Sequence, residues 1–281
     1  MILLDCESID SIYGSLETIA GAKRSAIESF LDSMDLDALY NSSSPPSCPR
    51  NDYLLDAFRK NFHSSLSYDA TCWFHLTRVA ENTNFEAGIL PLGQQLDSIW
   101  DFLHSLVRTA ISEKLWNDFR QGKLQGTDYL MKTENPFHWG PYAILVRDIA
   151  FMPKEVGNHD YLFGPEIVED ICICFEKVHK IDLLALFRKS TKPCIVKFVD
   201  STPQSKYLRA TIFYLYATHR HDRLRDYCND GLDARGVAVP RDRILKVEFP
   251  AYEPNTGSAS TIARKHSGEV GGWAGTGGSS A

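Results

Sequence analysis

Hydrophobic and polar positions alternate along the chain in two periods, one typical of helices and one of strands. Apolar residues recur every three or four positions in several segments, which is the spacing of an amphipathic helix. The longest such stripe runs from Gln94 to Phe119. Helices are predicted in the segments 7–40 (one or two), 53–62, 94–119, from Pro165 onward, and 207–227.

Shorter runs rich in apolar, β-branched and aromatic residues predict strands. The most informative is Ala70–Arg78, which begins apolar and places polar side chains at its end. The other predicted strands are 142–151, 193–200 and, around a proline turn, 237–249. Helices and strands in this mixture predict an α+β fold.

Composition breaks suggest four segments. Residues 1–42 form an N-terminal helical segment, and the proline- and serine-rich stretch 43–51 reads as a linker. The main domain is expected at 52–252. Residues 253–281 are rich in glycine and serine, which predicts a flexible tail.

The charge and cysteine content of the chain indicate which kinds of partner, metal site and cell compartment to expect. The 36 acidic and 30 basic residues give a net charge of −6, which favours a protein over a nucleic acid as macromolecular partner. Seven scattered cysteines lack a CxxC pair, which predicts reduced thiols and no zinc clip. The sequence shows no leader pattern and no apolar run of membrane-spanning length, so a soluble cytoplasmic protein without membrane contact is expected.

The end of the 70–78 strand carries the candidate binding chemistry. Residues two apart in a strand point the same way, so His75 and Thr77 are predicted to share a face and to offer ring nitrogens and a hydroxyl to one ligand. Arg78 points to the other face, but from a strand end it could reach a phosphate. His75 and Thr77 suit the 2′- and 3′-hydroxyls of a ribose or a carboxamide, and Arg78 suits a phosphate.

At these residues the chain resembles a family. WFHLTRV, followed after a polar stretch by FEAGILPL, is similar to the opening motif of ADP-ribosyltransferases of the diphtheria-toxin and poly(ADP-ribose) polymerase type. The resemblance covers about 20 residues. It implies a mixed or antiparallel sheet split around a cleft, NAD as substrate, a toxin-like glycosyltransferase activity and a macromolecular acceptor.

Site residues follow from the same resemblance. His75 and Thr77 match the residues that hold NAD, and Tyr142 in GPYAILV matches the tyrosine that stacks on the nicotinamide. The catalytic acid is ambiguous, because family order leads to Asp230 or Asp233 where a glutamate is expected, with Glu248 on the last strand as the other possibility.

Three functions remain open from the sequence. The first is NAD-dependent ADP-ribosyl transfer, in which a carboxylate stabilises positive charge that develops on the ribose. The second is a catalytically silent module of the same fold that binds NAD, ADP-ribose or a partner. The third is an unrelated hydrolase with His75 or His138 as general base and a cysteine or aspartate as nucleophile. No metal site is predicted.

Overall fold

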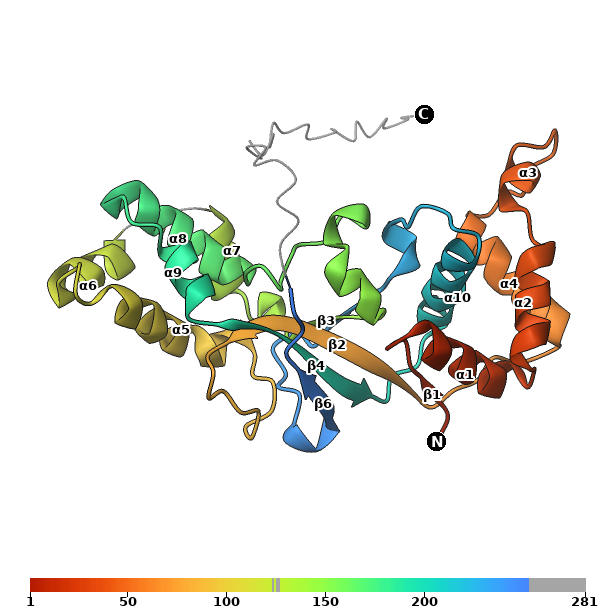
Figure 1. Ribbon diagram of the computed structural model, residues 1–281, viewed down its shortest axis with the longest axis horizontal. Coiled ribbons are helices and arrows are strands. Elements are labelled where there is room, and N and C mark those ends of the chain that lie inside the picture. The colour runs from red at the N-terminus through yellow and green to blue at the C-terminus, as the bar shows by residue number, and fades with distance from the viewer. Residues whose placement is uncertain (123, 125–126, 253–281) are drawn as a thin grey trace, which may run out of the picture.

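A six-stranded sheet lies at the centre of the molecule, with helices gathered at both of its ends (Figure 1). The computed structural model describes residues 1–122, 124 and 127–252. The expected tail 253–281 lies outside these residues. The strands are β1 (Leu3–Leu4), β2 (Ala70–Val79), β3 (Tyr142–Ile144), β4 (Lys192–Asp200), β5 (Gly231–Asp233) and β6 (Ile244–Glu248). The predicted α+β class is confirmed.

Strand β2 occupies the middle of the order β5-β3-β2-β4-β6. It pairs with β4 in antiparallel fashion from Thr71 to Val79, whereas its ladder with β3 has the single pair Phe74 and Ile144. The two-residue strand β1 runs parallel to the start of β2. The sheet is therefore mostly antiparallel, and its two halves are joined unequally to β2.

The side chains of β2 define two faces of the sheet. We call one the Trp73 face, which carries Trp73, His75 and Thr77 with their β4 partners Phe198, Val196 and Cys194. The other, the Phe74 face, carries Phe74, Leu76 and Arg78 with Lys197, Ile195 and Pro193. Alternation along paired strands assigns every later residue of β4 and β6 to one of these faces.

The helices at one end of the sheet pack into the same core as its strands. Trp73 is fully buried there, with its ring 4.8 Å from that of Tyr207. The N-terminal segment supplies β1 and several helices to this core, so the stretch 43–51 does not separate two cores. These helices are α1 (Ile9–Ala20), α2 (Arg24–Ser33), α3 (Leu36–Tyr40), α4 (Arg50–Phe62) and α10 (Ser205–His219).

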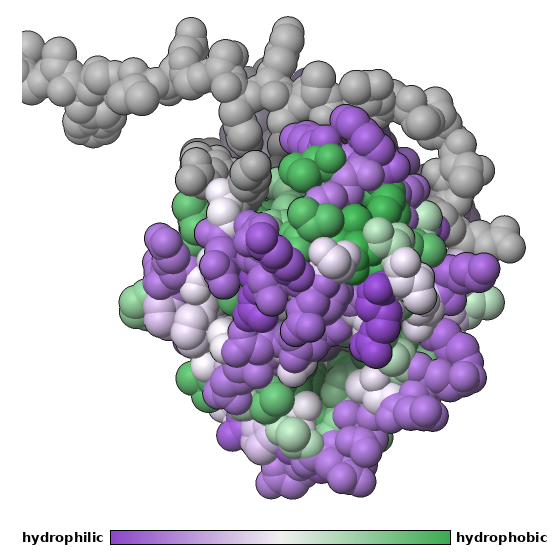
Figure 2. All heavy atoms as spheres, turned by 90° about the vertical axis from the view of Figure 1, so that its left-hand side faces the viewer, coloured by the Kyte–Doolittle hydropathy of each residue, from purple (hydrophilic) through white to green (hydrophobic). Residues whose placement is uncertain are grey.

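A second core lies among the helices at the other end, around Trp100, Trp116 and Phe175. Figure 2 shows this end of the molecule, whose surface is mostly hydrophilic with hydrophobic side chains gathered in its upper part. The helices are α5 (Leu92–Val107), α6 (Glu113–Gly122), α7 (Thr127–Glu134), α8 (Glu166–His179) and α9 (Leu183–Lys189). Within the described ranges, no helix has the length and apolar character needed to cross a bilayer.

Two predicted elements are interrupted. The helix expected at 94–119 is broken into α5 and α6 because Ser112 starts a new helix, where its carbonyl accepts from the Trp116 N–H at 3.0 Å. The strand expected at 142–151 stops at Ile144. There the side-chain oxygen of Asn229 accepts hydrogen bonds from the N–H groups of Leu145 and Val146, both at 3.1 Å, and a 3₁₀ helix follows.

An ion network ties the N-terminal segment to the Phe74 face. The Lys197 ammonium, in β4, lies 2.6 Å from Asp5 and 2.7 Å from Glu7, and its side chain is only 10% exposed. Although partial burial opposes ionisation of Glu7, hydrogen bonds from Lys197 and Lys246 lower its pKa from 4.5 to about 2. These contacts fix β1 and the start of α1 against the sheet.

We expect Lys197→Met to lower the free energy of unfolding by about 3 kcal/mol, because it leaves two carboxylates without their buried cation. Chemical denaturation measures this change. Lys192→Met is the matched control on the same strand, since Lys192 forms only an exposed pair with Glu81 and should change stability by less than about 1 kcal/mol. Because the pKa of folded Glu7 lies below its unfolded value, the wild type should also lose stability as the pH falls from 4.5 towards 2. Equal effects of the two variants would contradict this account.

Candidate functional site

The His75 side chain is held by the neighbouring strand. Its Nδ1 atom lies 2.7 Å from the backbone carbonyl oxygen of Tyr142. A carbonyl oxygen only accepts, so Nδ1 must carry the hydrogen and, in the neutral ring, Nε2 is an acceptor. Burial lowers the pKa of His75, and the Tyr142 hydrogen bond only partly opposes that shift. The structure thus supplies a neutral imidazole whose Nε2 can accept a hydrogen bond from a ligand hydroxyl.

Thr77 lies on the same face of β2 as His75, as predicted. Their partners on β4 are Cys194 and Val196, both of which belong to the buried core. The Thr77 hydroxyl is partly buried and makes one long hydrogen bond, 3.5 Å, to the carbonyl of Arg78. The pair therefore forms a short polar strip on an otherwise apolar strand face.

Tyr142 has an unusually open ring for a strand residue. Its side chain is 40% exposed, and its ring lies against the bare Cα of Gly140, where an added Cβ would be 2.9 Å from Cδ2. Partial burial raises the pKa of the hydroxyl to about 12, and the nearby carboxylates of Asp233 and Glu166 act in the same direction. Because Gly140 has no side chain, the Tyr142 ring can lie in this position, and any larger residue there would collide with it.

Asp233 is the direct partner of Tyr142 across the β3–β5 ladder. One of its carboxylate oxygens accepts a hydrogen bond from the backbone N–H of Arg235 at 2.8 Å, and the residue is exposed. Asp230, by contrast, binds the ammonium of Lys206 at 3.0 Å. Counted from the pair Phe74 and Ile144, the side chains of Tyr142 and Asp233 fall on the Phe74 face, whereas His75 lies on the Trp73 face. The three residues therefore meet at the junction of β2, β3 and β5 only through the contact of His75 with the Tyr142 backbone carbonyl.

Glu248 lies elsewhere, which argues against its candidate role as the acid. It sits on β6 opposite Ile195 and is separated from β2 by β4, on the side of the sheet away from β3 and β5. Its carboxylate is already bound to Arg147 at 2.6 Å and to Lys246 at 3.2 Å. Glu248 does not share a site with His75, and its ion pairs give it a structural role.

The candidate role of Arg78 in phosphate binding also needs correction. Its guanidinium donates to the carbonyls of Leu162 at 2.7 Å, Arg188 at 3.0 Å and Thr191 at 2.8 Å, and to the Thr191 hydroxyl at 3.1 Å. All of these partners are protein atoms. Arg78 therefore joins β2 to the segments before α8 and after α9, and its donors are occupied.

Three loops pack closely beside the junction: those at Gly88, at Gly140 and at 236–239. Gly88 and Val239 meet where Ile89 and Val239 exchange backbone hydrogen bonds of 2.8 and 2.9 Å, and a side chain at Gly88 would collide with the Val239 carbonyl. Gly236 donates to the carbonyl of Gly140 at 2.7 Å. The glycine of FEAGILPL is thus required by a close backbone approach, a reason the sequence did not reveal.

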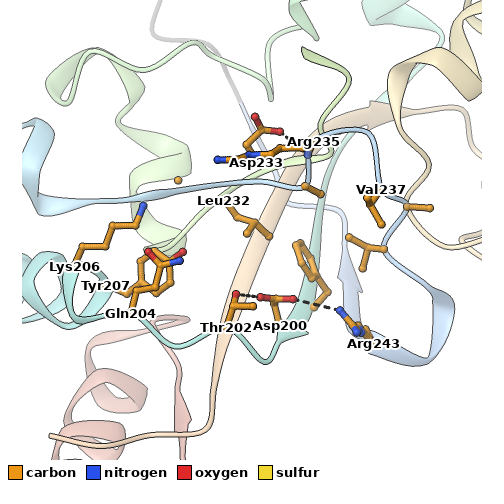
Figure 3. A pocket seen from close by; sticks show the side chains of 15 residues that line it. Asp200, Thr202, Gln204, Lys206, Tyr207, Leu232, Asp233, Arg235, Val237 and Arg243 are labelled. Atoms are coloured by element: carbon orange, nitrogen blue, oxygen red, sulfur yellow. Dashed lines mark hydrogen bonds and ion pairs between the residues drawn. The ribbon is translucent and has the colours of Figure 1, made fainter. Parts of the chain in front are cut away.

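A polar pocket of about 570 Å³ lies on the other side of β5 (Figure 3). Leu232 points into it, whereas Asp233 and Arg235 lie across the strand. Its polar lining includes Asp200, Thr202, Gln204, Lys206 and Arg243. Sequence reasoning missed these residues, because β4, the start of α10 and the link to β6 meet only in the folded chain.

Six of the seven cysteines are poorly suited to act as the nucleophile of the hydrolase hypothesis. All seven cysteines are free, and burial raises the pKa of six of them, including Cys194 opposite Thr77, whose pKa is raised to about 12. A protonated thiol is a weak nucleophile. His138 is exposed at the surface. The part of the chain that the structure describes holds no cluster of three potential metal ligands.

We expect Arg78→Lys to lower the free energy of unfolding by about 2 to 4 kcal/mol, because lysine keeps the charge but cannot reach all of the acceptors of the guanidinium. Chemical denaturation measures the loss. Arg59→Lys is the matched control, since Arg59 forms only an exposed pair with Asp56. If Arg78→Lys matched this control in stability and instead weakened ligand binding, Arg78 would be a ligand contact after all.

Comparison with known proteins gives no external guide to the site. No family model matches the chain, and no match was found among curated proteins or solved structures. The function must be argued from the junction of His75, Tyr142 and Asp233 and from the pocket beside it.

Proposed function

We propose that this protein binds NAD at the junction of β2, β3 and β5 and transfers its ADP-ribose group to an acceptor. The observation that carries the proposal is the hydrogen bond from His75 Nδ1 to the Tyr142 carbonyl. It leaves Nε2 free to accept from a ribose hydroxyl and links the histidine to the backbone of β3 at Tyr142, whose open ring lies on the other face of the sheet. Thr77 adds a second hydroxyl contact on the same face.

The strand pairing supports a sheet that splits at this point. β2 and β3 share one register pair, and one residue later a side chain of β2, rather than its backbone, bonds to β3. Strands that separate in this way leave room between them for a ligand. The split agrees with the cleft that the resemblance to ADP-ribosyltransferases implies.

Each residue then has a chemical task. The exposed Tyr142 ring offers one face to the nicotinamide, and Asp233 lies beside it on β5. In the reaction the bond between the nicotinamide nitrogen and ribose C1′ breaks, and nicotinamide leaves with the electron pair. The acceptor donates a lone pair to C1′ and loses its proton to solvent. A carboxylate near the ribose stabilises the positive charge that develops there.

Asp233 is the best placed of the three sequence candidates, since Asp230 is paired with Lys206. It pairs with Tyr142 across the strands, whereas Glu248 is engaged by Arg147 and Lys246 on another part of the sheet. An aspartate is one methylene shorter than the glutamate that the resemblance implies, so the ribose must approach β5 closely. The free thiols fit a reducing compartment, and we place the activity in the cytoplasm.

We expect His75→Asn to weaken NAD binding by roughly tenfold or more, which is the loss of one or two hydrogen bonds in a partly buried site. Asparagine can still donate to the Tyr142 carbonyl from a position near that of Nδ1, but it has no atom equivalent to Nε2. Titration calorimetry with NAD measures the change, and thermal unfolding checks that the variant folds. Undiminished binding by the variant would contradict the proposed contact.

The pH dependence of NAD binding provides an internal control. Because the pKa of His75 is lowered from 6.5, Nε2 remains an acceptor at neutral pH and becomes protonated only in more acid solution. Affinity should therefore be constant above pH 6.5 and fall below it in the wild type. His75→Asn should show no such fall.

We expect Asp233→Asn to retain NAD binding within about threefold and to lower ADP-ribosyl transfer or NAD hydrolysis by a factor on the order of 100, as the loss of one transition-state contact implies. Nicotinamide release measures the reaction. Glu248→Gln is the matched control, with stability reduced but turnover retained. NAD binding without nicotinamide release by the wild type, under any condition, would make the protein a silent binding module of the same fold.

A further inference from the structure

The pocket in Figure 3 lies on the Trp73 face, the face that carries His75 and Thr77 of the proposed NAD site. Phe198 forms part of its wall, and its partner on β2 is Trp73, two residues before His75 on the same face. A strand rises about 3.3 Å per residue, so this part of the pocket is about 7 Å along β2 from His75. Strand β5, which carries Asp233, forms the opposite wall. The pocket is therefore placed to hold a second reactant beside the first.

Its lining combines an apolar wall with groups that form directional hydrogen bonds. Phe198, Leu232 and Val239 supply apolar surface. Asp200, Thr202 and the Gln204 amide lie together along the lower side, where the Thr202 hydroxyl donates to Asp200. An apolar wall beside amide, hydroxyl and carboxylate groups suits a flat heterocycle with donors and acceptors at its edge.

The lining contains three cations, of which Arg235 lies across β5, whereas Lys206 and Arg243 lie at separate ends of the pocket. Lys206 is 3.0 Å from Asp230, and Arg243 is 3.3 Å from Asp200. Both side chains remain substantially exposed, at 40% and 51%. The carboxylates hold the cations in position without burying them. Each cation can therefore still bind a phosphate oxygen from the pocket side.

The N-terminus of α10 adds to the positive electrostatic potential that Lys206 and Arg243 create at the pocket. Gln204 occupies the N-cap position without a capping side-chain hydrogen bond, and the first turn contains no acidic residue. Lys206 lies in that turn. The positive end of a helix dipole thus adjoins the pocket at the same end as a lysine, an arrangement that favours an anion.

We propose that this pocket binds a phosphorylated nucleoside, with its base against the apolar wall and its phosphate near Lys206 or Arg243, and that this group is the ADP-ribose acceptor. A volume of about 570 Å³ lies within the range of small-molecule sites. The acceptor role rests on the proposed NAD-dependent function, whereas nucleotide binding does not. The net charge of −6 led us to expect a protein as acceptor. The lining of this pocket instead favours a nucleotide.

Binding is tested with 5′-mononucleotides by titration calorimetry of the full chain without NAD. We expect saturable binding that one of the two variants Lys206→Met and Arg243→Gln weakens by roughly tenfold, the loss of one charge-assisted contact, which identifies the cation that holds the phosphate. Lys192→Met and Arg59→Gln are matched controls that break exposed ion pairs elsewhere and should bind like the wild type. His75→Asn should also bind mononucleotide normally, which separates this pocket from the NAD contact.

Three results would overturn the proposal. If NAD binds but no mononucleotide does, the pocket assignment fails while the proposed function stands. If mononucleotide competes with NAD for one site, the pocket belongs to the NAD site and not to an acceptor. If the pocket variants bind mononucleotide as well as their controls do, the ligand lies elsewhere.

The product of the reaction shows whether the acceptor is a free nucleotide or the end of a nucleic acid strand. Wild type with NAD is offered a free mononucleotide in one reaction and a short 5′-phosphorylated oligonucleotide in another, and mass spectrometry looks for added ADP-ribose. A modified free nucleotide identifies a metabolite acceptor, and a modified oligonucleotide alone identifies a strand end. Modification of neither, under conditions that release nicotinamide, overturns the acceptor role even if mononucleotide binds.

Discussion

The rest of the structure depends on the pairing of β2 with β4. These two strands form the long ladder of the sheet, and every other strand attaches to one of them or to a neighbour. Their alternation fixes which side chains enter the core on the Trp73 face and which form the smaller apolar cluster and the ion network on the Phe74 face. A shift of one residue in this register would exchange the two sets and bury Lys197 in an apolar core.

The site arises where that regular pairing stops. β3 meets β2 at one residue pair, and the next position on β2 is His75, whose ring completes the contact with the Tyr142 carbonyl. A backbone carbonyl that would otherwise lack a strand partner thereby selects the histidine tautomer. The same interruption leaves the Tyr142 ring exposed against Gly140. The proposed binding site therefore lies where the pairing of β2 with β3 ends.

Charged side chains that are fully engaged within the protein differ from the charged side chains of the candidate sites, which remain exposed. Arg78, Lys197 and Glu248 are all engaged by partners within the protein and serve to join segments. Asp233 has one backbone hydrogen bond, and the cations of the neighbouring pocket keep much of their surface exposed. This contrast between satisfied and available groups could not be seen in composition, because both sets contain the same residue types.

The sequence by itself determined the α+β class, the position of β2 and the shared face of His75 and Thr77, because these follow from local periodicity. It left the acid between Asp233 and Glu248 and assigned a ligand to Arg78. Only the tertiary structure shows that Asp233 lies beside Tyr142 and that backbone carbonyls surround the Arg78 guanidinium, because both depend on contacts between distant segments. The pocket at Lys206 and Arg243 was likewise invisible, because its walls come from segments that are distant in the chain and meet only after folding.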